Sequence, residues 1–181
     1  MNRIIIENIV AYAQVADVLD MQLISEKIPE TSYDPEQFPG ISWKFDEPKV
    51  AILILPNGRI VCTGANKPDD VECVIKNVVS KIKKIGFEIK KDYCIETENV
   101  VASVDLKKDM HLSSIANGLL LKHVDYEPKH FPGLIYRLED QDAVLLLFSS
   151  GKLVCTGAKS IEDAKSAIAT MEEKLTSLGV L

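Results

Sequence analysis

The chain has 181 residues and a formal net charge of −6 at pH 7, from 21 Lys and Arg against 27 Asp and Glu. Hydrophobic residues make up 46% and charged residues 27%, close to the average for globular proteins, so a disordered acidic tail, a collagen-like fibre and a coiled coil are excluded. The acidic excess, taken alone, argues against nucleic-acid binding, because basic patches supply most of the non-specific affinity for phosphate.

The first half of the sequence predicts several strands and two helices. Apolar, β-rich runs bounded by Pro, Gly and Asn indicate the strands, and Pro56-Asn57-Gly58 is typical of a tight hairpin. An apolar stripe at spacings of three and four, from Val71 to Ile82, indicates an amphipathic helix. In chain order we expect a strand at 3–14, a helix opened by Asp17 or Asp20, a turn at 35–40, strands at 41–46, 50–55 and 59–63, and a helix at 68–85.

The same elements are expected a second time, because the sequence contains an internal duplication. Three strings return in the same order: E-N-I-V-A at 7–11 as E-N-V-V-A at 98–102, Y-D-P-E-Q-F-P-G at 33–40 as Y-E-P-K-H-F-P-G at 126–133, and V-C-T-G-A at 61–65 again at 154–158. The two copies are predicted to span residues 1–91 and 92–181, each folding as strand, helix, four strands, helix. Connections this short favour an antiparallel sheet, so the predicted fold class is α+β.

The cysteine and histidine spacings predict neither a metal site nor a cofactor. No C-x-x-C pair occurs, and the three histidines lie far in sequence from any pair of cysteines. Cys62 and Cys155 lie in the apolar V-C-T-G-A strings and are predicted to be buried free thiols. Without a signal peptide or a membrane-length apolar run, the chain is expected in a reducing, cytoplasmic compartment.

Strands 50–55 and 143–148 are apolar on both faces, although each copy has only two helices to cover one face. The second face is therefore either a binding surface or packed against another sheet in a sandwich, and the sequence pattern leaves both open. In the expected hairpins Phe38 lies near Leu55, and Phe131 lies near Phe148. These pairs are interpreted as caps of the core edge or as apolar wedges.

Around this second face the sequence places Asn and Thr side chains and a border of basic residues. Asn8 and Asn99 match each other in the two copies, as do Thr63 and Thr156. Apolar side chains, polar donors and a cationic border suit an opened DNA minor groove, where A·T pairs present only acceptors. A solvated rim is the alternative for the basic residues.

The repeated strings closely resemble the TATA-box-binding protein family, and the resemblance covers essentially the whole chain. It is greatest to the archaeal form. The resemblance implies a saddle of two pseudo-symmetric halves, with a curved antiparallel sheet and helices on the convex side. It also implies binding and bending of the TATA box from the minor groove, a mode for which this family is itself the standard example, and nucleation of preinitiation-complex assembly.

The resemblance assigns roles to matching positions of this sequence. The intercalating residues would be Phe38, Leu55, Phe131 and Phe148, where Leu55 departs from the phenylalanine of the family. The minor-groove contacts would be Asn8, Val10, Leu53, Val61, Thr63, Asn99, Val101, Leu146, Val154 and Thr156. The phosphate contacts would be Lys44, Asn57, Arg59, Arg137, Ser150, Lys152 and Lys159.

The resemblance also implies protein partners. Glu127, Lys129 and His130 match the turn that contacts transcription factor B, and the RNA polymerase machinery would follow. Homodimerisation through the apolar face in the absence of DNA is left open. Since no catalytic constellation is found, we expect a nucleoid-associated cytoplasmic protein of an archaeal cell and not an enzyme. The alternatives are a substrate-recognition module of a nucleic-acid-processing enzyme and a small-molecule binder.

Overall fold

The computed structural model describes residues 3–119, 123–138 and 142–181. The first copy contains β1 (Ile5–Gln14), α1 (Met21–Lys27), β2 (Ser32–Tyr33), β3 (Ile41–Phe45), β4 (Val50–Ile54), β5 (Arg59–Ala65) and α2 (Pro68–Lys84). The second contains β6 (Ile95–Asp105), α3 (Leu112–Gly118), β7 (Val124–Asp125), β8 (Leu134–Arg137), β9 (Val144–Leu147), β10 (Lys152–Ala158) and α4 (Ile161–Ser177). The predicted order of strand, helix, four strands and helix is confirmed among the described residues of both copies, and its fourth strand, for which no range was predicted, is the two-residue β2 or β7.

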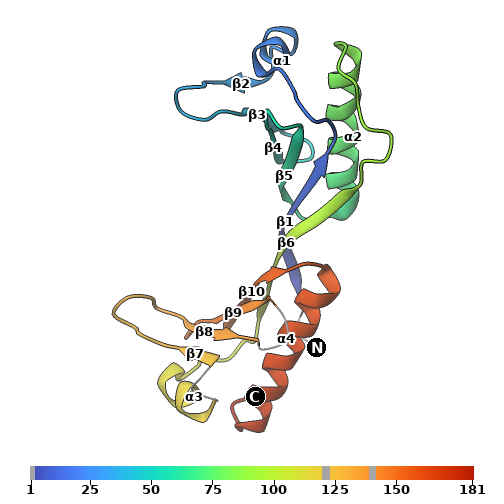
Figure 1. The fold of residues 1–181 in the computed structure, drawn as a ribbon. Helices are drawn as coiled ribbons and strands as arrows, with labels where there is room; N and C mark the ends of the chain where they lie inside the picture. The colour runs from blue at the N-terminus through green and yellow to red at the C-terminus, as the bar shows by residue number, and fades with distance from the viewer. Residues whose placement is uncertain (1–2, 120–122, 139–141) are drawn as a thin grey trace. The chain divides into compact units, whose positions relative to one another are not determined.

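The strands make up one antiparallel sheet with two five-stranded halves, in the orders β2-β3-β4-β5-β1 and β6-β10-β9-β8-β7 (Figure 1). The α+β class with an antiparallel sheet is confirmed. The alternative of a sandwich of two sheets is wrong, because the strands belong to a single sheet.

The chain forms two compact units whose boundaries lie inside β1 and β6. One unit is Asn8–Glu98, and the other joins the residues up to Glu7 to Asn99–Leu181. The first residues of β1 thus belong to the second unit. The predicted boundary between residues 91 and 92 separates the two copies of the duplicated sequence, which differ from these compact units, and it stays a prediction.

In the first unit one face of the half-sheet packs under the helices. Ile52, Ile54 and Ile60 are fully buried, and α2 packs against β5. The predicted helical stripe is confirmed, since all of its members are buried: Val71, Val74, Ile75, Val78, Val79 and Ile82. Asp20, and not Asp17, begins α1, because its side chain accepts a hydrogen bond from the Leu23 amide at 3.0 Å.

The second unit repeats this arrangement. A single cluster joins Leu112 and Ile115 of α3, Ile168 of α4, and Leu145 and Leu153 of the strands. Both helices of this unit therefore lie on the same face of its half-sheet. Ser160 begins α4 by accepting a hydrogen bond from the Asp163 amide at 3.0 Å.

Candidate nucleic-acid interface

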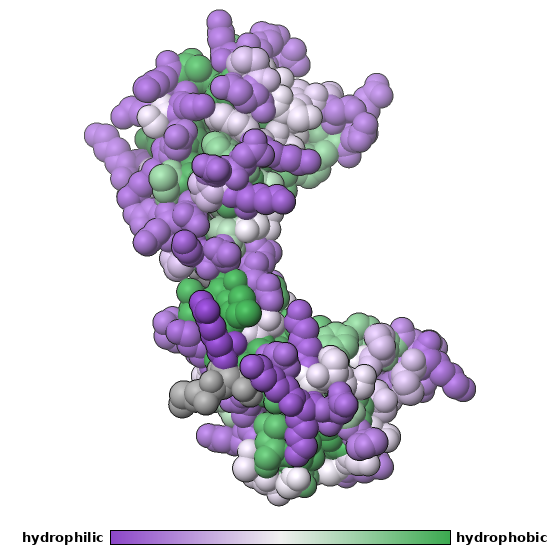
Figure 2. All heavy atoms as spheres, turned by 180° about the vertical axis from the view of Figure 1, so that it is seen from behind, coloured by the Kyte–Doolittle hydropathy of each residue, from purple (hydrophilic) through white to green (hydrophobic). Residues whose placement is uncertain are grey.

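The face of each half-sheet opposite its helices is partly exposed. Along β4 the side chain of Leu53 is half-buried between the buried Ile52 and Ile54, and along β10 Val154 lies in the same way between Leu153 and Cys155. All ten predicted minor-groove contacts are half-buried on this open face: Asn8, Val10, Leu53, Val61, Thr63, Asn99, Val101, Leu146, Val154 and Thr156. Figure 2 shows apolar residues at the surface among the polar residues that cover most of that view.

A β-bulge aims the polar residues of the first copy. Between the pairs Ile9–Ala65 and Ala11–Cys62 the register shifts, so that two residues, Thr63 and Gly64, oppose a single residue of β1. Gly64 has a φ of +97°, which favours glycine because it has no Cβ. Its amide donates a 2.7 Å hydrogen bond to Asn8 Oδ1, and Asn8 Nδ2 lies 3.4 Å from Thr63 Oγ1.

The second copy reproduces this geometry. Its register shift lies between Cys155–Ala102 and Ala158–Val100. Gly157, with a φ of +87°, donates a 2.7 Å hydrogen bond to Asn99 Oδ1, and Asn99 Nδ2 lies 3.5 Å from Thr156 Oγ1. In both copies the asparagine oxygen is occupied by a backbone amide, so the NH2 group is the part left to act as donor toward a ligand.

Two pairs of apolar side chains lie at the turns that border the open face. Phe131 and Phe148 are in edge-to-face contact, with ring centroids 5.9 Å apart and an interplanar angle of 62°. Phe38, 39% exposed, is paired with Leu55, since both lie within 3.0 Å of where a Cβ on Gly40 would be. The expected proximity of both pairs is confirmed.

Hydrogen bonds in the turns fix the backbone of each wedge residue. The amides of Phe38 and Phe131 donate to the carbonyls of Asp34 and Glu127 at 2.9 and 3.0 Å. The amides of Leu55 and Phe148 donate to the carbonyls of Arg59 and Lys152, both at 2.9 Å, which closes the β4–β5 and β9–β10 hairpins. The two wedge pairs are therefore displayed by ordered turns.

Basic and small polar side chains border the open face. Lys44, Arg137, Lys152 and Lys159 are exposed. Asn57 and Ser150 lie at the two hairpin tips, where their side chains accept hydrogen bonds from the amides two residues later at 3.2 and 3.5 Å. An open hollow of about 440 Å³ is lined by Lys44, Lys49 and Thr63, among others. Lys49, in the turn between β3 and β4, is a basic residue of this border that sequence reasoning missed.

The border is not of one charge sign, contrary to the sequence interpretation. Arg59 lies over the ring of Tyr12, with its Cζ 3.8 Å from the ring centroid, and its Nη2 lies 3.3 Å from Glu98 Oε1. The Tyr12 hydroxyl donates to Glu96 Oε2 at 2.8 Å, and this hydrogen bond raises the pKa of Tyr12. Neither glutamate was predicted, because no sequence pattern indicates that residues of β6 lie beside the start of β5.

Comparison with known proteins identifies the family. The family model "Transcription factor TFIID (or TATA-binding protein, TBP)" matches residues 3–85 and 94–178. The chain belongs to this family. The TATA-box-binding proteins of Archaeoglobus fulgidus and Haloarcula marismortui are 42% and 44% identical to it, covering 99% and 97% of this chain and 98% and 95% of their own lengths. The solved structure titled "Methanococcus jannaschii TBP" matches with a TM-score of 0.85 and 38% identity, over 97% of this chain and 99% of that one.

The TATA-binding protein family consists of transcription factors and not of enzymes, in agreement with the sequence prediction. The relatives from Archaeoglobus fulgidus and Haloarcula marismortui are archaeal, as the resemblance implied. Among the described residues no group of three His, Cys, Asp or Glu side chains could hold a metal ion, and none of the described helices is long and apolar enough to cross a membrane.

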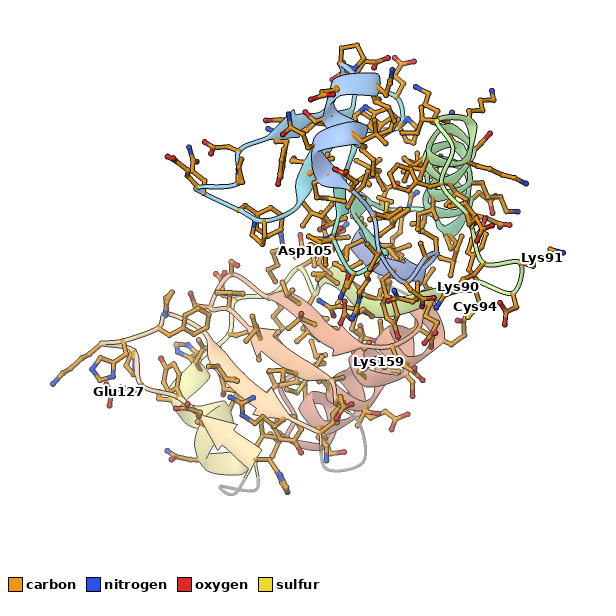
Figure 3. All side chains as sticks on the ribbon, turned by 45° about the horizontal axis from the view of Figure 1, so that its top comes forward. Lys90, Lys91, Cys94, Asp105, Glu127 and Lys159 are labelled. Carbon is orange, nitrogen blue, oxygen red and sulfur yellow. The ribbon has the colours of Figure 1, made fainter. Side chains whose placement is uncertain are left out.

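The turn assigned to a protein partner is exposed. Glu127, Lys129 and His130 lie in the loop between β7 and β8, which projects from its unit, and Figure 3 shows Glu127 there. The Glu127 carbonyl accepts the amides of His130 and Phe131 at 2.9 and 3.0 Å, so the loop that displays the charged residues also displays a wedge ring.

Two of the four thiols are buried, as predicted. Burial raises the pKa of Cys62 and of Cys155 from 9.0 to about 11. Both are free and contribute to the core, whereas Cys73 and Cys94 are free and exposed.

Proposed function

We propose that this chain binds the TATA box from the minor groove, bends it, and nucleates assembly of the transcription preinitiation complex. The observation that carries the proposal is the duplicated site: each copy has an oriented Asn–Thr pair, an apolar open face and a wedge pair at its turns. Family membership gives the class of ligand, and the duplication matches the pseudo-symmetry of an A·T-rich duplex.

Selectivity for A·T follows from the open-face chemistry. In the minor groove an A·T pair presents acceptors only, whereas a G·C pair adds the amino group of guanine. Asn8 and Asn99, with their oxygens engaged by Gly64 and Gly157, offer NH2 donors toward such acceptors. Guanine would bring a donor against these donors and a bulky group against the apolar side chains.

Bending would come from the wedge pairs. Inserting apolar side chains between base steps costs on the order of a few kcal/mol per step in unstacking, which is offset by the larger contact of bent DNA with protein. Phe131 and Phe148 can stack two rings against an opened step. In the first copy Leu55 supplies no ring beside Phe38, so we propose that the two kinks are unequal.

Phosphate contacts would come from the basic and hairpin-tip residues that border the face. Lys44, Arg137, Lys152 and Lys159 are exposed where a duplex on the open face would bring its strands. Because each phosphate neutralised releases condensed counterions, affinity should fall linearly with salt on logarithmic axes. Asn57, Arg59 and Ser150 complete the proposed set.

The protein partners follow from the family. We propose that the loop with Glu127, Lys129 and His130 binds transcription factor B, which then recruits RNA polymerase at the nucleoid. In the absence of DNA, the half-buried open face is the surface through which two copies would associate.

The proposal is tested by binding of two labelled duplexes of equal length, one with an A/T-rich promoter and one with a G·C-rich sequence. We expect tight binding and a bend for the A/T-rich duplex only. Equal affinity for the two duplexes, or binding of an unbent A/T-rich duplex, would refute it. A nuclease assay of the same mixtures tests the alternative of a module from a nucleic-acid-processing enzyme.

A further inference from the structure

The two copies differ at one corresponding position on the border of the open face. In the unit Asn8–Glu98, the residues Tyr12, Arg59, Glu96 and Glu98 form a cluster. The sequence matches of the duplication place Ser103, Lys152, Ile5 and Glu7, in that order, at the corresponding positions of the other unit. The cluster is therefore specific to one half of the proposed interface.

The Arg59 guanidinium is held from two sides in the structure. The Tyr12 ring lies 3.8 Å from Cζ, which is cation–π geometry, and Glu98 accepts from Nη2 at 3.3 Å. Tyr12 is in turn fixed by its 2.8 Å hydrogen bond to Glu96. The positive charge of Arg59 is thus already paired with other side chains of the same protein.

This engagement is incomplete. Arg59 Nε is buried and has no hydrogen-bond partner in the part of the chain that the structure describes, and a buried donor without an acceptor is costly. A phosphate can accept from two guanidinium nitrogens at once in a bidentate arrangement. A phosphate can therefore replace Glu98 as the partner of Arg59 once this ion pair opens, and it can also accept the hydrogen bond that Arg59 Nε lacks.

The corresponding place in the other unit is open. A hollow of about 350 Å³ is lined by Glu7, Ser103 and Lys152, among others. Ser103 Oγ donates to Glu7 Oε1 at 2.5 Å, so Glu7 is engaged by a neutral hydroxyl. Lys152 is exposed and makes no ion pair within 4.0 Å among the described residues.

We propose that Tyr12 and Glu98 are positioning residues that hold Arg59 in the free protein. Arg59 then contacts phosphate only by exchanging this ion pair, whereas Lys152, at the corresponding position, is available at once. The inference rests on the proposed function. DNA engagement is then unequal in the two halves, and Glu98 lowers overall affinity.

The experiment measures the affinity of an A/T-rich promoter duplex by fluorescence anisotropy at several salt concentrations. Glu98→Gln keeps the shape of the side chain and removes its charge. Exposed ion pairs are worth about 0.2–1 kcal/mol, so we expect tightening of about 1.4- to five-fold. Because salt screens the Arg59–Glu98 pair that the wild-type chain must break, the tightening should be largest at low salt. The slope of log affinity against log salt should therefore become steeper, by less than the value of about 0.9 for a whole phosphate contact.

Glu7→Gln is the matched control, since it removes the same charge at the corresponding position without releasing a cation. We expect it to change both the affinity and the salt slope less than Glu98→Gln does. In an Arg59→Gln background, Glu98→Gln should have little effect, because its partner is gone. Tyr12→Phe, which keeps the ring and loses the bond to Glu96, should give a smaller tightening than Glu98→Gln. Thermal unfolding checks that each variant is folded.

The outcomes separate this inference from the proposed function. If the wild-type chain shows no preference for the A/T-rich duplex, the proposed function fails. If the wild-type chain binds selectively but Glu98→Gln and Glu7→Gln change affinity and salt slope equally, repulsion between carboxylates and DNA explains both, and the inference alone is overturned. The inference alone is also overturned if Glu98→Gln tightens binding as much in the Arg59→Gln background as in the wild-type chain.

Discussion

Replacing Gly133 by Ala should separate the Phe131–Phe148 wedge pair while leaving the fold intact. A Cβ at this position would lie 2.8 Å from Phe131 Cε1 and 3.1 Å from Phe148 Cε1, and 3.3 Å from the Leu147 carbonyl oxygen. The two ring contacts are the close ones. Since Gly133 does not have a positive φ, Ala can adopt its backbone conformation.

The expected magnitude follows from these distances. Ordinary contact begins at 3.4 Å, so the Phe131 ring must move by about 0.6 Å and the Phe148 ring by about 0.3 Å. Edge-to-face aromatic pairs contribute about 0.5–1.5 kcal/mol beyond area burial, and part of this is lost. Both rings are partly exposed and can shift, so the free energy of unfolding should fall by only about 0.5–1 kcal/mol. Loss of a similar energy from the wedge predicts affinity for the A/T-rich duplex lowered about two- to five-fold.

The assay is a titration of the duplex with donor and acceptor dyes at its ends, which reports affinity and bending together. Gly118→Ala is the matched control, because its Cβ would lie equally close, 2.8 Å, to a side-chain carbon of Leu178, on the helix side of the same unit. We expect the control to bind and bend as the wild-type chain does. Unchanged bending by Gly133→Ala would refute the role of ring spacing in the wedge.

Three further predictions concern the first wedge, the buried thiols and a helix cap. Leu55→Phe should place a second ring beside Phe38, which should increase the bend and raise the affinity about two- to ten-fold. An unaltered bend in the two-dye titration would contradict this. Cys62 and Cys155, with pKa raised to about 11, should resist alkylation at pH 8 while Cys73 and Cys94 react. Between pH 9 and 11 the two buried thiols ionise in the unfolded chain but not in the folded one, so the free energy of unfolding should fall as the pH rises. Denaturant titrations at about pH 7.5 and pH 10 would measure this loss. Ser160→Ala should lower the free energy of unfolding by about 1 kcal/mol, because the Asp163 amide at the start of α4 loses its acceptor; a midpoint of denaturation equal to that of the wild-type chain would count against the cap.

The features predicted well were those in which sequence spacing fixes geometry. The stripe from Val71 to Ile82 could be placed because helical periodicity directs its members to one face. The contact of Phe131 with Phe148 followed from antiparallel pairing alone, since the start of one strand must lie beside the end of the next. The apolar second face was recognised because two helices per copy cannot cover both sides.

The features that escaped prediction depend on register and on distant residues. Asn8 and Thr63 were matched to the family's polar readers, yet their mutual contact requires the bulge at Gly64, which strand patterns do not reveal. The cluster of Tyr12, Arg59 and Glu98 joins three strands, and its members are separated by tens of residues in the sequence. An intramolecular partner for a predicted phosphate contact becomes visible only when the strands are paired.

The central claim is that a ring wedge at the turn of β9 bends an A/T-rich duplex bound on the open face. Its most direct test is the end-to-end distance of the labelled duplex in complex with the wild-type chain and with Phe148→Ala, at protein concentrations that saturate both. We predict a bent duplex with the wild-type chain and a clearly smaller bend with Phe148→Ala. Equal end-to-end distances in the two saturated complexes, or a straight duplex with the wild-type chain, would contradict the claim.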